Sequence, residues 1–236
     1  MKLSQKKVKL EEEGKKKMNR KKLVRIILFG APGAGKGTQA EAMEELFKFT
    51  KISTGDLIRD EVKHGTQIGK EVEAVIARGD LVPDDIIVNL LNLRLEKGDI
   101  CCGYIVDGFP RTINQAEILS SMPVEKEVVI YLKVSNEDLI VNRVISRLIC
   151  NNCGHIYNLQ IEPPKVEGKC DHCGGNIRQR KDDKEVVIRK RIQIYRDQTK
   201  PVIQYYRNKG MLHEIDAVQS VEEVFNNIKQ IIGVLN

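Results

Sequence analysis

The nine residues from Gly30 to Thr38, GAPGAGKGT, are the stretch of this sequence most clearly suited to chemistry. Glycine has no Cβ, so a glycine-rich loop lets several backbone N–H groups converge on one set of phosphate oxygens. Lys36 adds a positive charge, and the Thr38 hydroxyl can approach a metal ion or a phosphate. The loop departs from the strict pattern G-x4-G-K-[ST], because Gly37 stands between the lysine and the threonine. By itself it predicts phosphate binding, with an ordinary glycine-rich turn as the alternative.

Four cysteines form a second group with an informative spacing. Cys150 and Cys153 make one C-x2-C-G knuckle, and Cys170 and Cys173 make another after an interval of sixteen residues. Each knuckle brings two thiolates to one metal ion, so the pair supplies the four sulfur ligands of a tetrahedral structural zinc site. Four protein ligands leave no open position, so we expect the metal to stabilise the chain without taking part in catalysis. Iron and a redox disulfide pair are the alternatives.

These two groups need a scaffold, and the apolar pattern of the chain predicts one. Leu23–Phe29 is a short apolar run that stops at a glycine, as a buried parallel strand does. A helical pattern follows to about Lys48. Further strands are expected at Tyr104–Val106, Val128–Leu132 and Met211–Ile215. Helices are expected near residues 83–97, 112–121, 135–149, 183–208 and 220–232. Alternating strands and helices predict an α/β fold with a central parallel sheet covered on both faces.

Three local features qualify this pattern. Residues 150–180 carry the four cysteines, two prolines and several glycines without a helical period, so we expect a small inserted module that zinc helps to fold. Pro201 falls inside a helical stretch and should kink or break it. The remaining cysteines, Cys101 and Cys102, open an apolar run and are interpreted as buried small hydrophobic residues.

Charge is concentrated at the beginning of the chain. Residues 1–22 carry ten basic and three acidic side chains, whereas the remaining residues carry 29 and 30. The net charge of +6 therefore belongs to a basic extension, interpreted as a solvated tail, and gives no support to a nucleic-acid-binding body. The chain has no apolar run long enough for a membrane helix and no secretory signal pattern. We therefore expect a cytoplasmic protein.

Six motifs in this order resemble those of the adenylate kinase family: GAPGAGKGTQA (30–40), STGDLIR (53–59), GDLVPD (79–84), DGFPRT (107–112), RKDD (180–183) and VIRKR (187–191). Gly37 is usual in the phosphate loop of that family. The resemblance covers residues 23–236 and implies a phosphate-loop fold that transfers a phosphoryl group from MgATP to AMP, giving two ADP without a covalent intermediate. It also implies a monomer with no membrane or nucleic-acid partner.

The resemblance divides the chain into three parts. A core comprises residues 23–52, 83–145 and 184–236. Residues 53–82 form a mobile helical segment that binds AMP. Residues 146–183 form a lid over ATP, here of the long form in which four cysteines hold zinc. The segment and the lid are expected to close on their nucleotides and to exclude water.

The resemblance also implies roles for individual residues. Five basic side chains are expected to position and neutralise the phosphates: Lys36, Arg111, Arg143, Arg180 and Arg191. ATP is expected to contact Gly33, Ala34, Gly35, Lys36, Gly37, Thr38, Arg143, Arg147, Ile156, Tyr157 and Gln219. AMP is expected to contact Thr54, Arg59, Asp80, Leu81, Val82, Gly108, Phe109, Pro110, Arg111, Gln115, Arg180 and Arg191. Asp107, at the end of an expected strand, would hold Mg²⁺ through water.

The choice of base depends on two of these positions. Thr54 and Gln115 lie at the adenine of AMP by resemblance, and a glutamine amide can both donate to and accept from the edge of a base. A kinase of the same fold that acts on another nucleoside monophosphate therefore remains an alternative. A zinc-ribbon nucleic-acid-binding module with a basic arm is an alternative of a different class. It would explain the cysteines and the extension but not the phosphate loop, DGFPRT or RKDD.

Overall fold

The computed structural model describes residues 23–233. The basic extension, residues 1–22, lies outside the described residues with residues 234–236, so its interpretation as a solvated tail stays a prediction. Among the helices of the described part, none combines the length and the apolar character that a membrane crossing requires.

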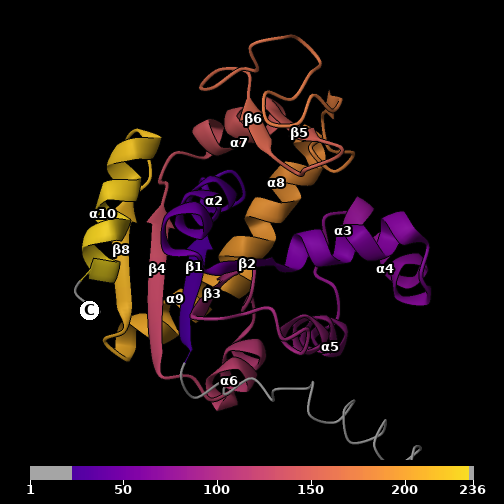
Figure 1. Ribbon diagram of the computed structural model, residues 1–236. Helices are drawn as coiled ribbons and strands as arrows, with labels where there is room; N and C mark the ends of the chain where they lie inside the picture. The colour runs from indigo at the N-terminus through magenta and orange to yellow at the C-terminus, as the bar shows by residue number, and fades with distance from the viewer. Residues whose placement is uncertain (1–22, 234–236) are drawn as a thin grey trace, which may run out of the picture.

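Five parallel strands form the central sheet, in the order β2-β3-β1-β4-β8 (Figure 1). They are β1 (Val24–Gly30), β2 (Thr50–Ser53), β3 (Gly103–Asp107), β4 (Lys126–Lys133) and β8 (Leu212–Asp216). The carboxyl ends of β1, β2 and β3 lie side by side, because Asp107 pairs with both Leu28 and Ser53. Open parallel sheets bind ligands at this edge. The predicted α/β fold is confirmed.

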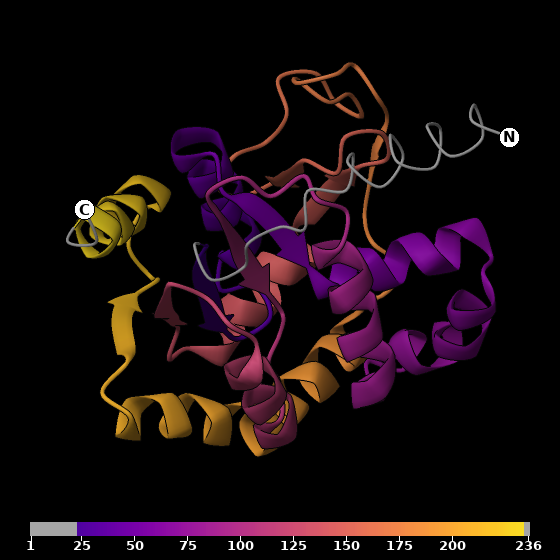
Figure 2. The same ribbon diagram turned by 60° about the horizontal axis from the view of Figure 1, so that its bottom comes forward.

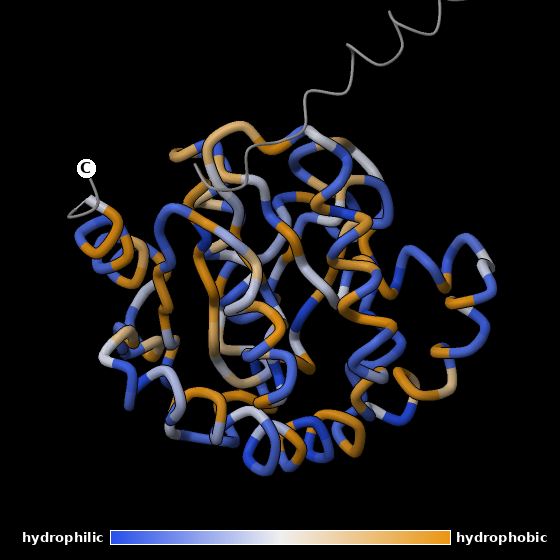
Figure 3. Tube along the Cα trace, turned by 90° about the horizontal axis from the view of Figure 1, so that it is seen from below, coloured by the Kyte–Doolittle hydropathy of each residue, from blue (hydrophilic) through white to orange (hydrophobic). Residues whose placement is uncertain are grey.

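Helices cover both faces of this sheet, as a parallel sheet requires. On one face α2 (Lys36–Phe47) and α10 (Val221–Gly233) pack against Ile26 and Leu28 of β1. On the other face Ile27 and Phe29 pack into a core that includes α5 (Asp84–Leu95), α6 (Ile113–Ser121), α7 (Glu137–Ile145), α8 (Glu185–Ile194) and α9 (Lys200–Asn208). Successive side chains of a strand point to opposite faces, so one apolar run fills both layers. Apolar residues accordingly follow the central strands in Figure 3.

Two parts of the chain lie outside these layers. After β2, the helices α3 (Thr54–His64) and α4 (Gln67–Ala77) extend beyond the edge of the sheet (Figures 1 and 2). Between α7 and α8 the chain forms a separate antiparallel sheet in the order β6-β5-β7. Its strands are β5 (Arg147–Cys150), β6 (Ile156–Asn158) and β7 (Ile177–Arg178). The inserted module expected from the sequence is therefore present and carries its own small sheet.

The structure corrects three expectations from the sequence. The helix expected to reach residue 149 ends at Ile145, because the next residues form β5, which pairs with β6 and β7 in the small sheet. Strand β2 was not expected, since only one residue of its short run TKIS, Ile52, is buried. Cys101 and Cys102 are exposed in a bend before β3, so their interpretation as buried residues was wrong.

Pro201 interrupts the helical stretch expected at residues 183–208. A five-residue π-helical turn, Tyr195–Thr199, separates α8 from α9, and Pro201 occupies the first turn of α9. Proline has no N–H and its ring would clash with the carbonyl four residues before it in an α-helix. A π-turn placed just before the proline is one of the recognised ways in which a helix accommodates such an interruption. The predicted break at Pro201 is confirmed in this form.

A buried ion pair inside the sheet gives a first testable prediction. Arg25 of β1 is 2% exposed and pairs with Glu127 of β4, while its guanidinium also reaches the carbonyl of Met122 at 3.3 Å. Replacing Glu127 by Gln leaves a buried charge without its counter-charge, so the free energy of unfolding should fall by about 2–3 kcal/mol. Urea unfolding measures it. Glu125→Gln removes an exposed charge nearby and should change it by less than about 0.5 kcal/mol; equal effects of the two would contradict the prediction.

Candidate active site

The glycine-rich loop lies where the sequence placed it, between β1 and α2. Gly33 and Gly35 have φ of +76° and +90°, a backbone conformation that side-chain-bearing residues rarely adopt. A Cβ at Gly33 would also lie 2.7 Å from Val144, so α7 packs directly against the loop. Lys36 Nζ donates to the carbonyls of Gly30 and Ala31 at 2.9 and 3.0 Å. The loop and its lysine therefore form a closed turn at the carboxyl edge of the sheet.

The surroundings of Lys36 lower the pKa of its ammonium group. Burial lowers its pKa to about 8, and the attraction of Asp107 only partly opposes that effect. The positive charges of Arg111, Arg191 and Arg147 act in the same direction as burial. Cations that lower each other's pKa values repel one another, and an anion bound among them relieves this repulsion.

A cavity beside the loop brings together most residues expected at AMP. It is lined by Thr54, Arg59, Asp80, Leu81, Val82, Gly108, Arg111, Gln115 and Arg191, among others. Thr54 Oγ1 donates to Gly108 O at 3.0 Å. A Cβ at Gly108 would lie 2.9 Å from Thr54 Oγ1. The close contact explains why glycine, at φ +82°, follows Asp107. Phe109 and Pro110 line an adjoining cavity that also contains Lys36.

Two arginines connect the loop with this cavity. Arg111 and Arg191 line both the cavity that contains Gln115 and the one that contains Lys36. Arg111 Nε donates to Gly108 O at 2.8 Å, and Arg191 pairs with Asp182 at 3.1 Å. Burial lowers the pKa of Arg111, and it lowers that of Arg191 to about 10 although Asp182 opposes the change. Their position between the two cavities is that of groups able to hold a phosphate from either side.

A larger cleft separates the core from the small sheet. It is lined by residues of α2, α3 and the small sheet, including Thr38, Arg59, His155 and Arg180. Burial lowers the pKa of Arg180 to about 9, reinforced by the charges of Arg59 and Arg147. Among the described residues, the Nε atoms of Arg180 and Arg143 are buried without a hydrogen-bond partner. Asp56 lies 3.8 Å from Arg180 and pairs more closely with Arg59.

The small sheet contacts the phosphate loop directly. A Cβ on Gly37 would lie 3.0 Å from Cδ1 of Ile156, so the extra glycine of the loop leaves room for that side chain. His155 Nδ1 lies 3.4 Å from a carboxylate oxygen of Glu41 on α2. These contacts place Ile156 at the mouth of the phosphate loop, as its expected role requires, although its contact with ATP stays a prediction.

Three residues expected at ATP are engaged by protein groups. Arg143 donates to the carbonyl of Ala217 at 2.9 Å, which ties α7 to the loop that carries Gln219. Arg147 is held by both carboxylate oxygens of Asp183 and lies on β5. Gln219 accepts from Asn227 of α10 at 3.1 Å. The contacts of these three residues with ATP stay predictions.

The side chain of Tyr157 is buried inside the small sheet. Its side chain is 3% exposed, and its hydroxyl lies 3.4 Å from Cys170 Sγ and accepts from the backbone N–H of Asp171 at 2.7 Å. Tyr157 therefore belongs to the interior of the small sheet, where the hydroxyl lowers the pKa of the Cys170 thiol to about 6. A contact between Tyr157 and ATP stays a prediction.

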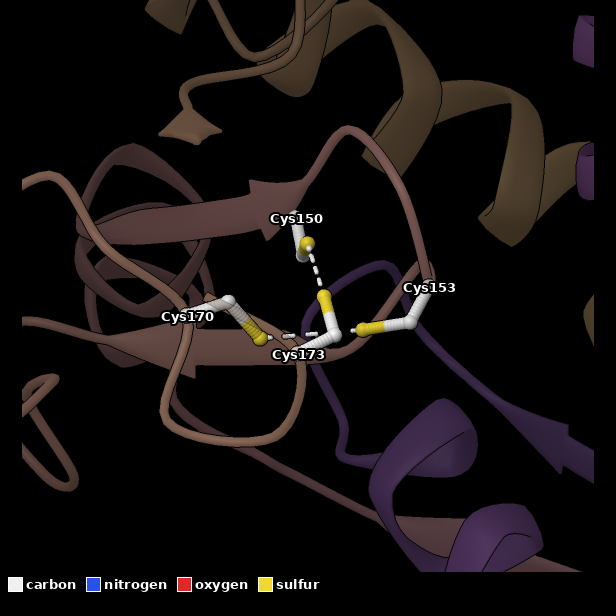
Figure 4. A group of neighbouring side chains, drawn as sticks. All are labelled: Cys150, Cys153, Cys170 and Cys173. Atoms are coloured by element: carbon white, nitrogen blue, oxygen red, sulfur yellow. Dashed lines mark hydrogen bonds between the residues drawn. The ribbon is translucent and has the colours of Figure 1, made fainter. Parts of the chain in front are cut away.

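The four cysteines of the two knuckles converge on one point (Figure 4). Their sulfur atoms all lie within 4.8 Å of one another, with Cys150 and Cys173 at 3.5 Å and Cys153 and Cys170 at 3.6 Å. Zn–S bonds of about 2.3 Å in a tetrahedron separate the sulfurs by roughly 3.8 Å. The cluster therefore fits a single tetrahedral metal ion.

One residue of this region was missed by the sequence reasoning. Asp84, the first residue of α5, accepts hydrogen bonds from Gln115 Nε2 at 2.6 Å, Asn114 Nδ2 at 2.8 Å and Thr112 Oγ1 at 3.0 Å. It ends the motif GDLVPD, so the motif contained the signal. Asp84 and Gln115 are far apart in the chain, and only the fold shows that they meet.

The parallel sheet, the glycine-rich loop at its carboxyl edge and the arginines between two cavities define a phosphate-loop phosphotransferase. A family model described as adenylate kinase matches residues 28–211. The adenylate kinase of Thermodesulfovibrio yellowstonii is 46% identical over 209 residues, which cover 87% of this chain and 97% of that protein. Those of Thermosipho melanesiensis and Clostridium botulinum are 46% and 42% identical, over 88% and 89% of this chain and 98% and 99% of theirs. The chain belongs to the adenylate kinase family.

Proposed function

We propose that this enzyme catalyses the reversible reaction MgATP + AMP ⇌ 2 ADP. The observation that carries the proposal is the placement of Arg111 and Arg191, which line both the cavity of the phosphate loop and the cavity that contains Thr54 and Gln115. Two nucleotides bound on either side would present their phosphates to the same two guanidinium groups. Phosphoryl transfer needs mainly such positioning and charge neutralisation, so no covalent intermediate is required.

We assign the acceptor, AMP, to the cavity lined by Thr54 and Gln115. Arg59 lies at its phosphate end with Arg111 and Arg191, and Asp80, Leu81, Val82 and Gly108 form its walls. Asp80 is itself paired with Arg78 at 3.2 Å and with Lys190 of α8, which supports a role in shaping the wall. Phe109 and Pro110 line the adjoining cavity with Lys36 and would support the same pocket.

We assign the donor, ATP, to the phosphate loop and the cleft above it. The backbone N–H groups of Gly33–Thr38 and the Lys36 ammonium would hold its terminal phosphates. Arg143, Arg147 and Arg180 would approach from the side of the small sheet, with Ile156, Tyr157 and Gln219 nearer the nucleoside. The unpartnered Nε atoms of Arg143 and Arg180 support this placement, because each leaves a donor for a phosphate oxygen.

Two oxygen donors near the loop fit a magnesium ion brought by ATP. The Asp107 carboxylate lies at the end of β3, and the Thr38 hydroxyl lies at the start of α2. Both are hard oxygen donors of the kind that Mg²⁺ prefers, and Asp107 would act through bound water. When bound, Mg²⁺ would supply positive charge that neutralises the phosphate oxygens. Adenylate kinases use this ion with ATP, and its site here is our proposal.

We propose that residues 53–82 and 146–183 move as two closing parts on a core of residues 23–52, 83–145 and 184–236. The helices α3 and α4 extend beyond the sheet, and the small sheet stands over the cleft, which supports a movement of both parts relative to the core (Figure 1). Arg147 and Asp183 pair across the two ends of the second part. Their closure would exclude water, which otherwise competes as acceptor.

We propose that the second part is a lid and that its cysteine cluster holds zinc. Four thiol groups with a tetrahedral spacing fit zinc better than they fit a harder cation. No fifth donor is needed, so the site supports a structural role. The monomeric state and the cytoplasmic location stay predictions.

The direct test of the proposed reaction is its stoichiometry. Purified enzyme with MgATP and AMP should form two ADP for each AMP consumed, and omission of AMP should abolish ADP formation. Ion-exchange chromatography of the nucleotides measures all three species. ADP formed at an equal rate without AMP would show a hydrolase and would overturn the proposal.

The lowered pKa of Lys36 predicts how activity depends on pH. The ammonium form binds phosphate, and its pKa of about 8 in the free enzyme lies below the usual value for lysine. The second-order constant kcat/KM for ATP should therefore be level below about pH 8 and fall above it as the proton is lost. Because arginine keeps its charge, the decline should be absent in whatever activity Lys36→Arg retains. If kcat/KM for ATP fell above about pH 8 in Lys36→Arg as it does in wild type, the titrating group would be one other than Lys36.

A further inference from the structure

The side-chain amide of Gln115 is held in one orientation by two protein groups. Its oxygen accepts from the backbone N–H of Arg111 at 2.7 Å, and its nitrogen donates to a carboxylate oxygen of Asp84 at 2.6 Å. A backbone N–H can only donate and an ionised carboxylate can only accept. Rotating the amide by a half turn would therefore place nitrogen against a donor and oxygen against an acceptor, and both hydrogen bonds would be lost.

Asp84 is itself fixed in place. Its second carboxylate oxygen accepts from Thr112 Oγ1 and Asn114 Nδ2, both at the start of α6. Thr112 also caps that helix by accepting from the backbone N–H of Gln115. The carboxylate therefore joins the first turns of α5 and α6, and the buried Gln115 (2% exposed) projects from the second of these helices. The contact is part of the scaffold rather than a mobile surface pair.

The fixed orientation determines what Gln115 offers to a ligand. A glutamine amide has two N–H groups and two oxygen lone pairs, so one of each remains after the contacts with Asp84 and Arg111. Gln115 lines the acceptor cavity. A base that accepts at one ring position and donates from the adjacent exocyclic group, as 6-aminopurine does at N1 and N6, can use both. A 6-oxopurine, with N1–H as donor and O6 as acceptor, requires the opposite orientation.

We propose that Asp84 is a positioning residue that sets the amide of Gln115 for 6-aminopurine monophosphates and against 6-oxopurine monophosphates. The inference rests on the proposed function, which places the acceptor base in this cavity. Asp84 acts without touching the base, through the hydrogen bond that prevents the amide from rotating. Discrimination of this kind arises because the wrong base leaves buried polar groups unpaired.

The test compares AMP with IMP as acceptors in wild type and in Asp84→Ala. Loss of the carboxylate frees the amide to rotate, so the ratio of kcat/KM for AMP to that for IMP should fall by about tenfold, the effect of one hydrogen bond. The change should appear mainly in KM, because Asp84 does not contact the phosphates. Asp84→Asn keeps the shape of the side chain and presents either a donor or an acceptor, so the ratio should fall in the same direction by a smaller factor.

Asp85→Ala is the matched control, because Asp85 is an exposed acid in the same first turn of α5. It removes the same charge and should leave the ratio unchanged. If both Asp84 variants lower AMP and IMP activity equally, so that the ratio matches wild type, Asp84 is only structural and the inference is overturned. If wild type itself prefers IMP to AMP, the proposed function fails first, which separates the two failures.

Discussion

Replacing Lys36 by Met should lower kcat for ADP formation by about 10²–10³-fold, the usual cost of removing one preorganised charge donor from a developing anion. Lys36 lies at the centre of the loop, with its ammonium held at 2.9 and 3.0 Å from two backbone carbonyls. Methionine has a similar length and no charge, so the packing of the loop should survive. Initial rates at saturating MgATP and AMP measure the effect.

Two measurements show whether this loss is specific to Lys36. Lys97→Met removes an exposed lysine that lines none of the three cavities and should leave kcat within about twofold, as surface substitutions usually do. The melting temperature of Lys36→Met should stay within a few degrees of wild type, because burial already disfavours the charged lysine. A Lys36 variant that keeps wild-type kcat would remove the lysine from the mechanism.

Removing the metal from the cysteine cluster should cause the largest loss of stability. Structural zinc contributes on the order of 10 kcal/mol in comparable small modules, and the small sheet has few other buried residues. Its described apolar core contains Cys150, Tyr157 and Cys170, with Leu148 and Ile177 packed against it. We expect Cys150→Ser to abolish stoichiometric zinc binding and to lower the melting temperature by about 10 °C or more. Calorimetry and metal analysis measure the two effects.

The exposed cysteines supply the control for this experiment. Cys101→Ser and Cys102→Ser change a thiol outside the cluster and should leave both zinc content and melting unchanged. At a temperature where all variants are folded, Cys150→Ser should lose far less in kcat than Lys36→Met, because the cluster leaves no open coordination position. A protein that contains no zinc, or melts identically without it, would contradict the structural site.

Much of the fold was predictable because its signals are local. The apolar run before Gly30 and the alternation that follows it predict a parallel sheet, and the structure confirms both. The limits of the helix near Arg147 were not predictable from periodicity, because pairing between β5 and β6 decides them. Cys101 and Cys102 were misjudged for the same reason. An apolar run tells which residues can be buried, whereas the bend before β3 decides which are.

Some parts of the candidate site were also predictable from local motifs, whereas others depend on how distant elements pack. The motifs STGDLIR and DGFPRT placed Thr54, Gly108 and Arg111 around one cavity. Each of these motifs begins where a strand ends, and the two strands end at the same edge of the sheet. The contact between Asp84 and Gln115 depends on how α5 and α6 pack, which no local pattern reports. Nor does any local pattern report that the Tyr157 hydroxyl contacts Cys170 of the cysteine cluster.

The central claim is that the cavity containing Gln115 selects AMP as the phosphoryl acceptor. Parallel assays with AMP, CMP, UMP and GMP at limiting concentration, each with saturating MgATP, give kcat/KM for the four acceptors directly. The account predicts that AMP exceeds GMP and UMP by about 10²-fold or more, because their ring N–H and carbonyl oxygen oppose the fixed amide and leave buried polar groups unpaired. CMP presents the same ring acceptor and exocyclic donor as AMP, so it should be disfavoured only by the smaller size of its base. A higher kcat/KM for any other monophosphate would contradict it.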